Sequence, residues 1–159
     1  MGDVIGYLLE VEPDSRVIVF AHNSHVLDYR ATDRANVQIS VGQIGRERFD
    51  AFLIMQSTFS GSVRAARDWG QADEVFEIEN AASNSLSFFL HHNVELKSFV
   101  FDLDSEIELR RIFQKPMSSR AIGVVYKAEQ ENLSHYFDCI HASACHALIH
   151  IDKTTALQK

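Results

Sequence analysis

Two histidines three residues apart are the side chains in this sequence whose type and spacing best suit chemistry at neutral pH. His22 and His25 lie in the segment A-H-N-S-H, directly after the apolar run at residues 16–20. One imidazole can act as an acid or a base near neutral pH, while the other donates a hydrogen bond. The competing interpretation is that this polar turn only caps backbone groups.

A second group of reactive residue types lies near the C-terminus, in the segment C-I-H-A-S-A-C-H that begins at Cys139. Cysteine and histidine are zinc ligands, but this spacing is not that of a known zinc motif. On a helix, Cys145 and His146 would also point in different directions. We therefore expect small buried residues with surface histidines, two reduced thiols, and neither a metal nor a cofactor.

Three further residues are candidates for binding a substrate. Asn23 lies between the two histidines, and Asp102 ends an apolar segment that can reach the same crevice. Trp69 offers a large aromatic surface to a ligand, although it suits the core equally well. Arg120 and Tyr126 flank an expected strand, where each can contact a ligand or tie the structure together. No serine lies in a G-x-S-x-G motif, so a serine hydrolase is not expected.

The pattern of apolar residues predicts the elements that position these side chains. Helices are expected at residues 1–11, 37–49, 84–92 and 105–113, with a capping box at Ser105 opening the last. Strands are expected at residues 16–20, 51–55, 74–78, 98–103, 121–126 and 147–151, and residues 56–70 are expected to be loop-rich. This alternation predicts an α/β fold with a mainly parallel sheet flanked by helices, which binds ligands at the carboxyl ends of its strands.

Length and composition describe one ordinary globular domain over residues 1–159. The chain is 46% hydrophobic and 23% charged, and a chain of this size can bury a substantial core. With 15 basic and 22 acidic residues, its net charge of −7 argues against a nucleic-acid partner. No apolar run is long enough to cross a bilayer, and the first residues do not resemble a secretion signal. We therefore expect a cytoplasmic protein without a membrane partner.

Seven segments follow one another in an order and spacing shared with a known family. They are residues 16–25 (R-V-I-V-F-A-H-N-S-H), 41–49 (V-G-Q-I-G-R-E-R-F), 60–70 (S-G-S-V-R-A-A-R-D-W-G), 101–103 (F-D-L), 120–126 (R-A-I-G-V-V-Y), 134–137 (S-H-Y-F) and 147–152 (A-L-I-H-I-D). Together they resemble the erythromycin esterase family, also described as succinoglycan-biosynthesis-like proteins. The sequence departs from the family pattern at Asp104, where arginine is common, and at Cys145-His146, where Phe-Asp is usual.

This resemblance implies a hydrolase that cleaves an ester without a metal. The best-known substrates of the family are the lactones of macrolide antibiotics, whose cleavage gives antibiotic resistance. A histidine is thought to act as the general base for an attacking water, while cationic or N–H groups stabilise the oxyanion. The resemblance places the paired catalytic histidines of the family on His22 and His25.

The resemblance covers only the carboxyl-terminal part of a family member. The G-E-x-x-H-G-type motif, which carries the proposed base and its helpers, does not occur in this sequence. The chain is then either a fragment of a longer enzyme or a natural short protein without the catalytic half. Because catalytic groups act as a unit, we expect little or no esterase activity from the chain alone.

A non-catalytic interaction module is the second class of function that the sequence allows. A sheet without its other half would expose an open edge and an apolar patch. We therefore expect the chain to form a homo-oligomer, to aggregate, or to associate with the missing amino-terminal half.

Overall fold

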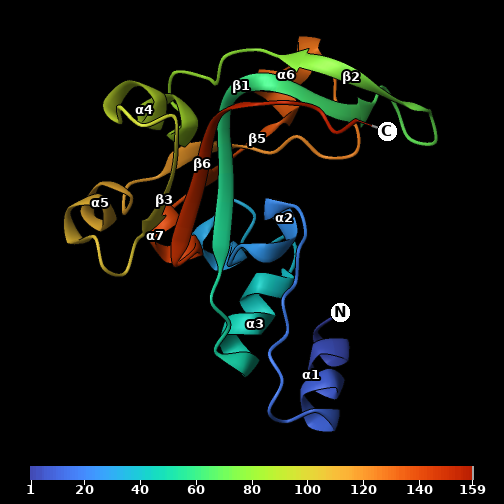
Figure 1. Ribbon diagram of the computed structural model, residues 1–159, viewed down its shortest axis with the longest axis vertical. Helices are drawn as coiled ribbons and strands as arrows, with labels where there is room; N and C mark the ends of the chain where they lie inside the picture. Colours follow the sequence, from blue (N-terminus) through green and yellow to red (C-terminus); the bar gives the residue numbers. More distant parts are fainter. Residues whose placement is uncertain (159) are drawn as a thin grey trace.

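Helices and strands alternate in the structure, a computed structural model that describes residues 1–158 (Figure 1). The α-helices are α1 (Gly2–Val11), α2 (Asn23–Val26), α3 (Val41–Phe49), α4 (Leu86–Asn93), α5 (Ile107–Ile112), α6 (Glu131–Ser134) and α7 (His141–Ala144). Two 3-10 helices are η1 (Tyr29–Ala31) and η2 (Ala128–Gln130). The strands are β1 (Ile54–Ala66), β2 (Asp73–Ile78), β3 (Ser98–Asp102), β4 (Met117–Arg120), β5 (Tyr136–Cys139) and β6 (Ala147–Thr154).

The main sheet is mixed rather than mainly parallel, so the predicted sheet type is wrong. Its four strands lie in the order β2-β1-β6-β3, and only the central pair, β1 and β6, is parallel. β4 and β5 form a separate antiparallel pair. The connection from β1 to β2 is residues 67–72, which is too short for the crossover that a parallel neighbour requires.

The apolar run at residues 16–20 does not form the expected buried strand. None of the described strands pairs with it, and the Ile18 and Phe20 side chains are 93% and 86% exposed. A strand needs a neighbour for its backbone hydrogen bonds. The composition of this run favours a strand, but residues 1–158 provide no partner for it.

Strand β1 extends through the segment that was expected to be loop-rich. It continues past Gly61, which has a φ of +120°. A Cβ atom built on Gly61 would lie 2.1 Å from the Thr154 carbonyl oxygen, so only glycine fits at this close contact with β6. The serine- and threonine-rich residues after Met55 suggested a loop, whereas pairing with β6 and β2 makes them a strand.

Several other predictions concern the helices and shorter strands. The structure confirms helices over most of 1–11, 37–49 and 84–92, with Ser85 accepting a hydrogen bond from the Phe88 N–H. It also confirms strands at 74–78, 98–103 and 147–151. The predicted capping box at Ser105 is wrong, because the N-cap of α5 is Glu106. The Ser105 hydroxyl donates to the Asp102 carbonyl instead of capping the helix. Residues 121–126 form only an isolated bridge to β1, while β4 and β5 were not predicted.

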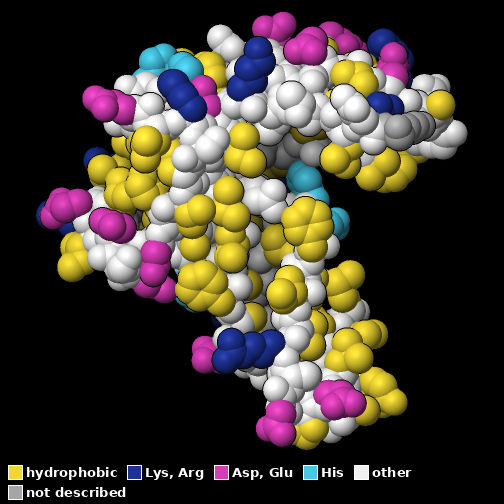
Figure 2. Space-filling model, in the orientation of Figure 1, with side chains coloured by type: hydrophobic (Ala, Val, Ile, Leu, Met, Phe, Trp, Pro, Cys, Tyr) yellow, Lys and Arg dark blue, Asp and Glu magenta, His cyan; other side chains and the backbone are white. Residues whose placement is uncertain are grey.

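The core lies between one face of the main sheet and the helices. Leu86 and Leu90 of α4 are fully buried against this face, together with Met55 and Leu148. Side chains alternate along a strand, so the neighbouring residues point to the opposite face. There the Val100 and Ile151 side chains stay exposed, and Figure 2 shows hydrophobic side chains gathered over β1 and β6. No helix in the described residues is long and apolar enough to span a membrane.

Candidate functional site

A cavity of about 180 Å³ lies beside the turn that contains the two histidines. Its wall includes His22 and Asn23 from that turn, Ser57 from β1, and Arg120 from the end of β4. Ile151 and other apolar residues of β6 complete the wall. The cavity therefore combines an imidazole with an apolar surface, at the face of the sheet that α4 leaves open.

His22 is the N-cap of α2, so this residue does cap a backbone group, while it also lines the cavity. Its Nδ1 atom accepts a hydrogen bond from the Ser24 backbone N–H at 3.2 Å and lies 2.8 Å from the Ser24 hydroxyl. Because a backbone N–H can only donate, Nδ1 must be unprotonated, and the ring proton of neutral His22 is on Nε2. The capping bond thus fixes which nitrogen can donate to a ligand.

The environment of His22 favours the neutral ring. Burial lowers its pKa, and the neighbouring His25 lowers it further, while a backbone hydrogen bond at Ile122 raises it. Neutral imidazole with its proton on Nε2 is a hydrogen-bond donor at neutral pH.

His25 lies next to His22 but is more open to solvent. The two ring centroids are 6.5 Å apart with an angle of 72° between the planes. His25 is exposed and is not among the described residues that line the cavity. The structure therefore brings the pair together, with one ring in the cavity wall and the other at its outer side.

Asn23 uses its side chain to hold the turn against β1. Its Nδ2 atom donates to the Gln56 carbonyl at 2.6 Å, and its Oδ1 atom accepts from the Gln56 N–H at 3.1 Å. Asn23 lines the cavity, but both polar atoms of its carboxamide are used in these bonds. Its role is therefore to position the histidines.

Trp69 and Asp102 do not join this site. Trp69 is 78% exposed in the turn between β1 and β2, so the alternative that Trp69 is a core residue is also wrong. Asp102 is at the end of β3, where its carboxylate accepts a hydrogen bond from the Asp104 N–H at 3.0 Å. Neither is among the described residues that line the cavity.

Arg120 is a structural tie that also forms part of the cavity wall. It donates to the Phe59 carbonyl at 3.0 Å and to the Glu79 carbonyl at 2.7 Å. It also donates to the Tyr136 hydroxyl at 3.0 Å and pairs with Glu131 at 2.7 Å. The Glu131 carboxylate, in turn, accepts a hydrogen bond from Tyr126.

A chain of polar side chains that was not predicted lies on the helix-covered face of the sheet. The buried His150 ring lies with Nδ1 2.7 Å from the Ser57 hydroxyl and with Nε2 3.5 Å from an Asp152 carboxylate oxygen. His91 of α4 lies 2.6 Å from the same carboxylate. Burial raises the pKa of Asp152, but its interactions with His91, His150 and Lys97 together lower it overall. The H-I-D segment and the helix-end His91 were the only signals of this contact.

The segment C-I-H-A-S-A-C-H packs in the core rather than at the surface. His141 is 1% exposed, with its Nε2 2.6 Å from the Ser119 hydroxyl, and burial lowers its pKa to about 4. The expectation of surface histidines is therefore wrong for this residue. Both cysteines are buried free thiols, and burial raises the pKa of Cys145 to about 12. In residues 1–158, no three His, Cys, Asp or Glu side chains are grouped to hold a metal.

Comparison with known proteins gives a family and a fold. The family model described as erythromycin esterase matches residues 1–154. A succinoglycan biosynthesis protein of known structure superposes with a TM-score of 0.79 at 21% identity, over 97% of this chain and 37% of that chain. A protein from Bacillus cereus gives a TM-score of 0.66 at 15% identity, over 84% of this chain and 32% of that one.

A third solved structure is a mutant of the erythromycin esterase EreC in its open conformation. It matches with a TM-score of 0.64 at 13% identity, over 96% of this chain and 35% of that chain. The chain thus spans about a third of the length of these three proteins.

Proposed function

Because this chain belongs to the erythromycin esterase family, we propose that it is part of a hydrolase that cleaves an ester or a macrolide lactone without a metal. The observation that carries this proposal is the neutral His22 ring in the wall of an open cavity. An apolar wall with a few fixed polar groups suits a lactone, whose body is apolar and whose reacting carbonyl is polar.

The two histidines divide the work in this proposal. Nε2–H of His22 donates to the carbonyl oxygen of the ester, at the place where the Ile122 backbone now hydrogen-bonds the ring. The exposed His25 orients the attacking water. The general base, which the family carries in the G-E-x-x-H-G motif that these 159 residues lack, takes the proton of that water. The water oxygen bonds to the carbonyl carbon, and the carbonyl oxygen gains the negative charge that His22 stabilises. Collapse of this intermediate breaks the ester C–O bond, and the leaving oxygen receives the proton from that base.

The isolated chain is proposed to have little or no esterase activity. The family motif G-E-x-x-H-G is not present in these 159 residues, and the chain spans about a third of the related structures. Burial and His25 lower the pKa of His22 and the Ile122 backbone raises it, and no carboxylate of residues 1–158 is among these causes. Removing one part of a catalytic unit removes most of its effect.

The test combines turnover with binding. We expect the chain to hydrolyse 4-nitrophenyl acetate no faster than its His22→Ala variant does. Titration with erythromycin is expected to change the amide spectra of residues around the cavity, and His22→Ala is expected to weaken these changes. His92→Ala, at an exposed histidine of α4, is the matched control. Turnover that disappears in His22→Ala would contradict the proposed inactivity, and spectral changes confined to other surfaces would contradict the proposed site.

A second candidate function is a non-catalytic interaction module of the same fold. The exposed Ile18 and Phe20 side chains and the open sheet face with Val100 favour it. Its partner would be a second copy of the chain or a separate polypeptide that supplies the missing half. Absence of erythromycin binding together with stable self-association would favour this function.

A further inference from the structure

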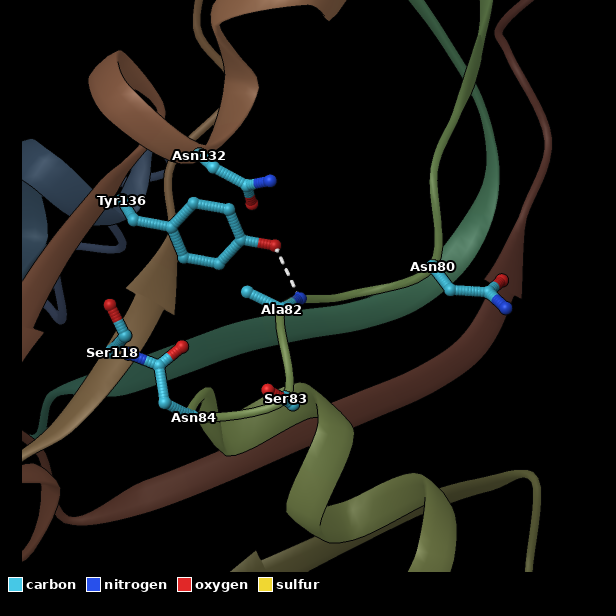
Figure 3. Close-up of a pocket in the computed structure, with 7 residues that line it drawn as sticks. All are labelled: Asn80, Ala82, Ser83, Asn84, Ser118, Asn132 and Tyr136. Atoms are coloured by element: carbon cyan, nitrogen blue, oxygen red, sulfur yellow. Dashed lines mark hydrogen bonds between the residues drawn. The ribbon is translucent and has the colours of Figure 1, made fainter.

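A second pocket lies where the loop before α4 meets β4, β5 and α6 (Figure 3). Its volume is about 360 Å³, twice that of the cavity at His22, and the two share no described lining residue. This volume falls within the range of small-molecule sites, roughly 300–1,000 Å³. The proposed hydrolase chemistry makes no use of this pocket.

The walls of the second pocket are polar and uncharged. Asn80, Asn84 and Asn132 contribute carboxamides, and Ser83 and Ser118 contribute hydroxyls. None of these five side chains hydrogen-bonds to another group in residues 1–158. A carboxamide offers a donor and an acceptor side by side, and a hydroxyl offers both on one atom. The pocket therefore presents several unused donors and acceptors but no net charge.

Ser118 is the observation that points most directly to a ligand. Its side chain is nearly buried, at 8% exposure, yet its hydroxyl has no partner in the described chain. The hydroxyl is not among the fully buried polar atoms of residues 1–158 that lack a partner, so it is open to the pocket that Ser118 lines. A ligand hydroxyl in the pocket can replace water as its hydrogen-bond partner.

Tyr136 makes this part of the pocket rigid. Its hydroxyl accepts hydrogen bonds from the Ala82 N–H and from Arg120, both at 3.0 Å, and the first of these is drawn in Figure 3. The Ser118 N–H donates to the Asn84 carbonyl at 3.3 Å and holds the loop against β4. A wall that is already fixed loses little conformational entropy when a ligand binds.

The charged groups behind this wall compensate each other. Arg120 and Glu131 pair at 2.7 Å with side chains only 4% and 5% exposed. Neither lines the second pocket, so it offers no positive group to a phosphate or carboxylate and no negative group to an amine. Of the residues that line it, Ala82 alone brings a purely apolar side chain.

We propose that this pocket binds a neutral, polyhydroxylated ligand about the size of one sugar ring. The hydroxyl groups of a sugar are donors and acceptors at once, which matches the carboxamides and serine hydroxyls of the wall. This assignment rests on the second pocket alone and does not depend on the function proposed for the cavity at His22.

The test is a titration of the isotope-labelled chain with methyl α-D-glucopyranoside, methyl α-D-mannopyranoside and cellobiose, followed by amide spectra. We expect saturable changes at Ala82, Ser83 and Asn132 with at least one of these sugars, at millimolar concentration. Asn80→Ala/Asn132→Ala removes two exposed side chains and is expected to weaken binding by about tenfold without loss of the fold. Asn36→Ala, an exposed asparagine outside the pocket, is the matched control and is expected to bind like the unchanged chain.

Inorganic phosphate and sodium acetate distinguish the chemical class. Changes at the same residues with these anions, and none with the sugars, would overturn the proposal. No change with any of the three sugars would overturn it as well, as would equal binding by the double variant. Thermal unfolding of each variant confirms that a loss of binding is not a loss of fold.

Discussion

Arg120 joins several segments of the chain through one buried side chain. It contacts β1, the residue after β2, β5 and α6 at the same time. Removing one partner of a buried ion pair leaves the other charge buried without compensation. The stability lost in this way is larger than the stability that the intact pair adds. This arginine should therefore be among the positions least tolerant of substitution.

Arg120→Met is expected to lower the free energy of unfolding by about 3–5 kcal/mol, because it leaves Glu131 charged and buried. Urea unfolding followed by circular dichroism measures this. Arg111→Met is the control, since Arg111 pairs with Glu108 at 3.7 Å on the surface and should cost about 1 kcal/mol or less. Equal losses in the two variants would contradict the role given to Arg120.

His141 makes the stability of the fold depend on pH. Its pKa is about 4 in the folded chain and about 6.5 in the unfolded chain. The unfolded state therefore binds a proton first as the pH falls. Titration of His141 therefore leaves the free energy of unfolding unchanged above about pH 6.5. Below that pH the free energy of unfolding falls progressively toward pH 4, by up to roughly 3 kcal/mol.

His141→Gln is expected to reduce the loss of stability between about pH 7.5 and pH 4.5, because glutamine does not titrate. Urea unfolding at both pH values gives the difference directly. His92→Gln, at an exposed position on α4, should leave the pH dependence unchanged. A pH dependence that is the same in the unchanged chain and in His141→Gln would show that His141 is not its source.

At the scale of the elements, the contact between β1 and β6 depends on Gly61. With a φ of +120° and a Cβ position 2.1 Å from the Thr154 carbonyl oxygen, this residue has no room for a side chain. Gly61→Ala is expected to destabilise the fold by about 3 kcal/mol or more, because β1 must move away from β6. Thermal and urea unfolding measure the loss.

Gly123→Ala is the matched control for this substitution. A Cβ atom at Gly123 would meet no heavy atom within 4 Å, so its effect should be within about 0.5 kcal/mol. A Gly61→Ala variant as stable as Gly123→Ala would contradict the steric argument.

The local pattern predicted elements well where the chain itself provides their neighbours. The strands at 98–103 and 147–151 formed because β3 and β6 pair with each other. The strand at 16–20 did not form, because an apolar run specifies a type of element but not a partner. β4 was missed because M-S-S-R contains no apolar alternation, and its pairing with β5 comes from tertiary structure.

The candidate site was predicted in part. His22 and Asn23 do line a cavity, but not for the predicted reason, because the apolar run before them forms no strand. Trp69 was placed by residue type and Asp102 by its position at the end of an expected strand. Neither lines the cavity, because that depends on a sheet order that no local pattern specifies. The pairing of His150 with Ser57 depends on the β1–β6 register, so it could not be predicted either.

For the molecule as a whole, exposed apolar side chains predict self-association. Ile18 and Phe20 are 93% and 86% exposed in one short run, and contiguous apolar surface of this kind marks interaction sites. Ile18→Ser/Phe20→Ser is expected to shift the chain toward the monomer, as measured by light scattering or sedimentation across a range of concentrations. Leu133→Ser, at a side chain outside this run that is 88% exposed, is the control and should not change association. A chain that is already monomeric at high concentration would contradict this prediction.

The side chain of Asn23 has one more consequence, for the way copies of this chain can stack. β2 pairs with β1 only from Gly61 onward, and at Gln56 the Asn23 carboxamide supplies the donor and acceptor that a peptide group of another strand would supply. This part of the sheet border therefore already has its hydrogen bonds. A fibril that grows strand by strand cannot start here unless both of these bonds break first.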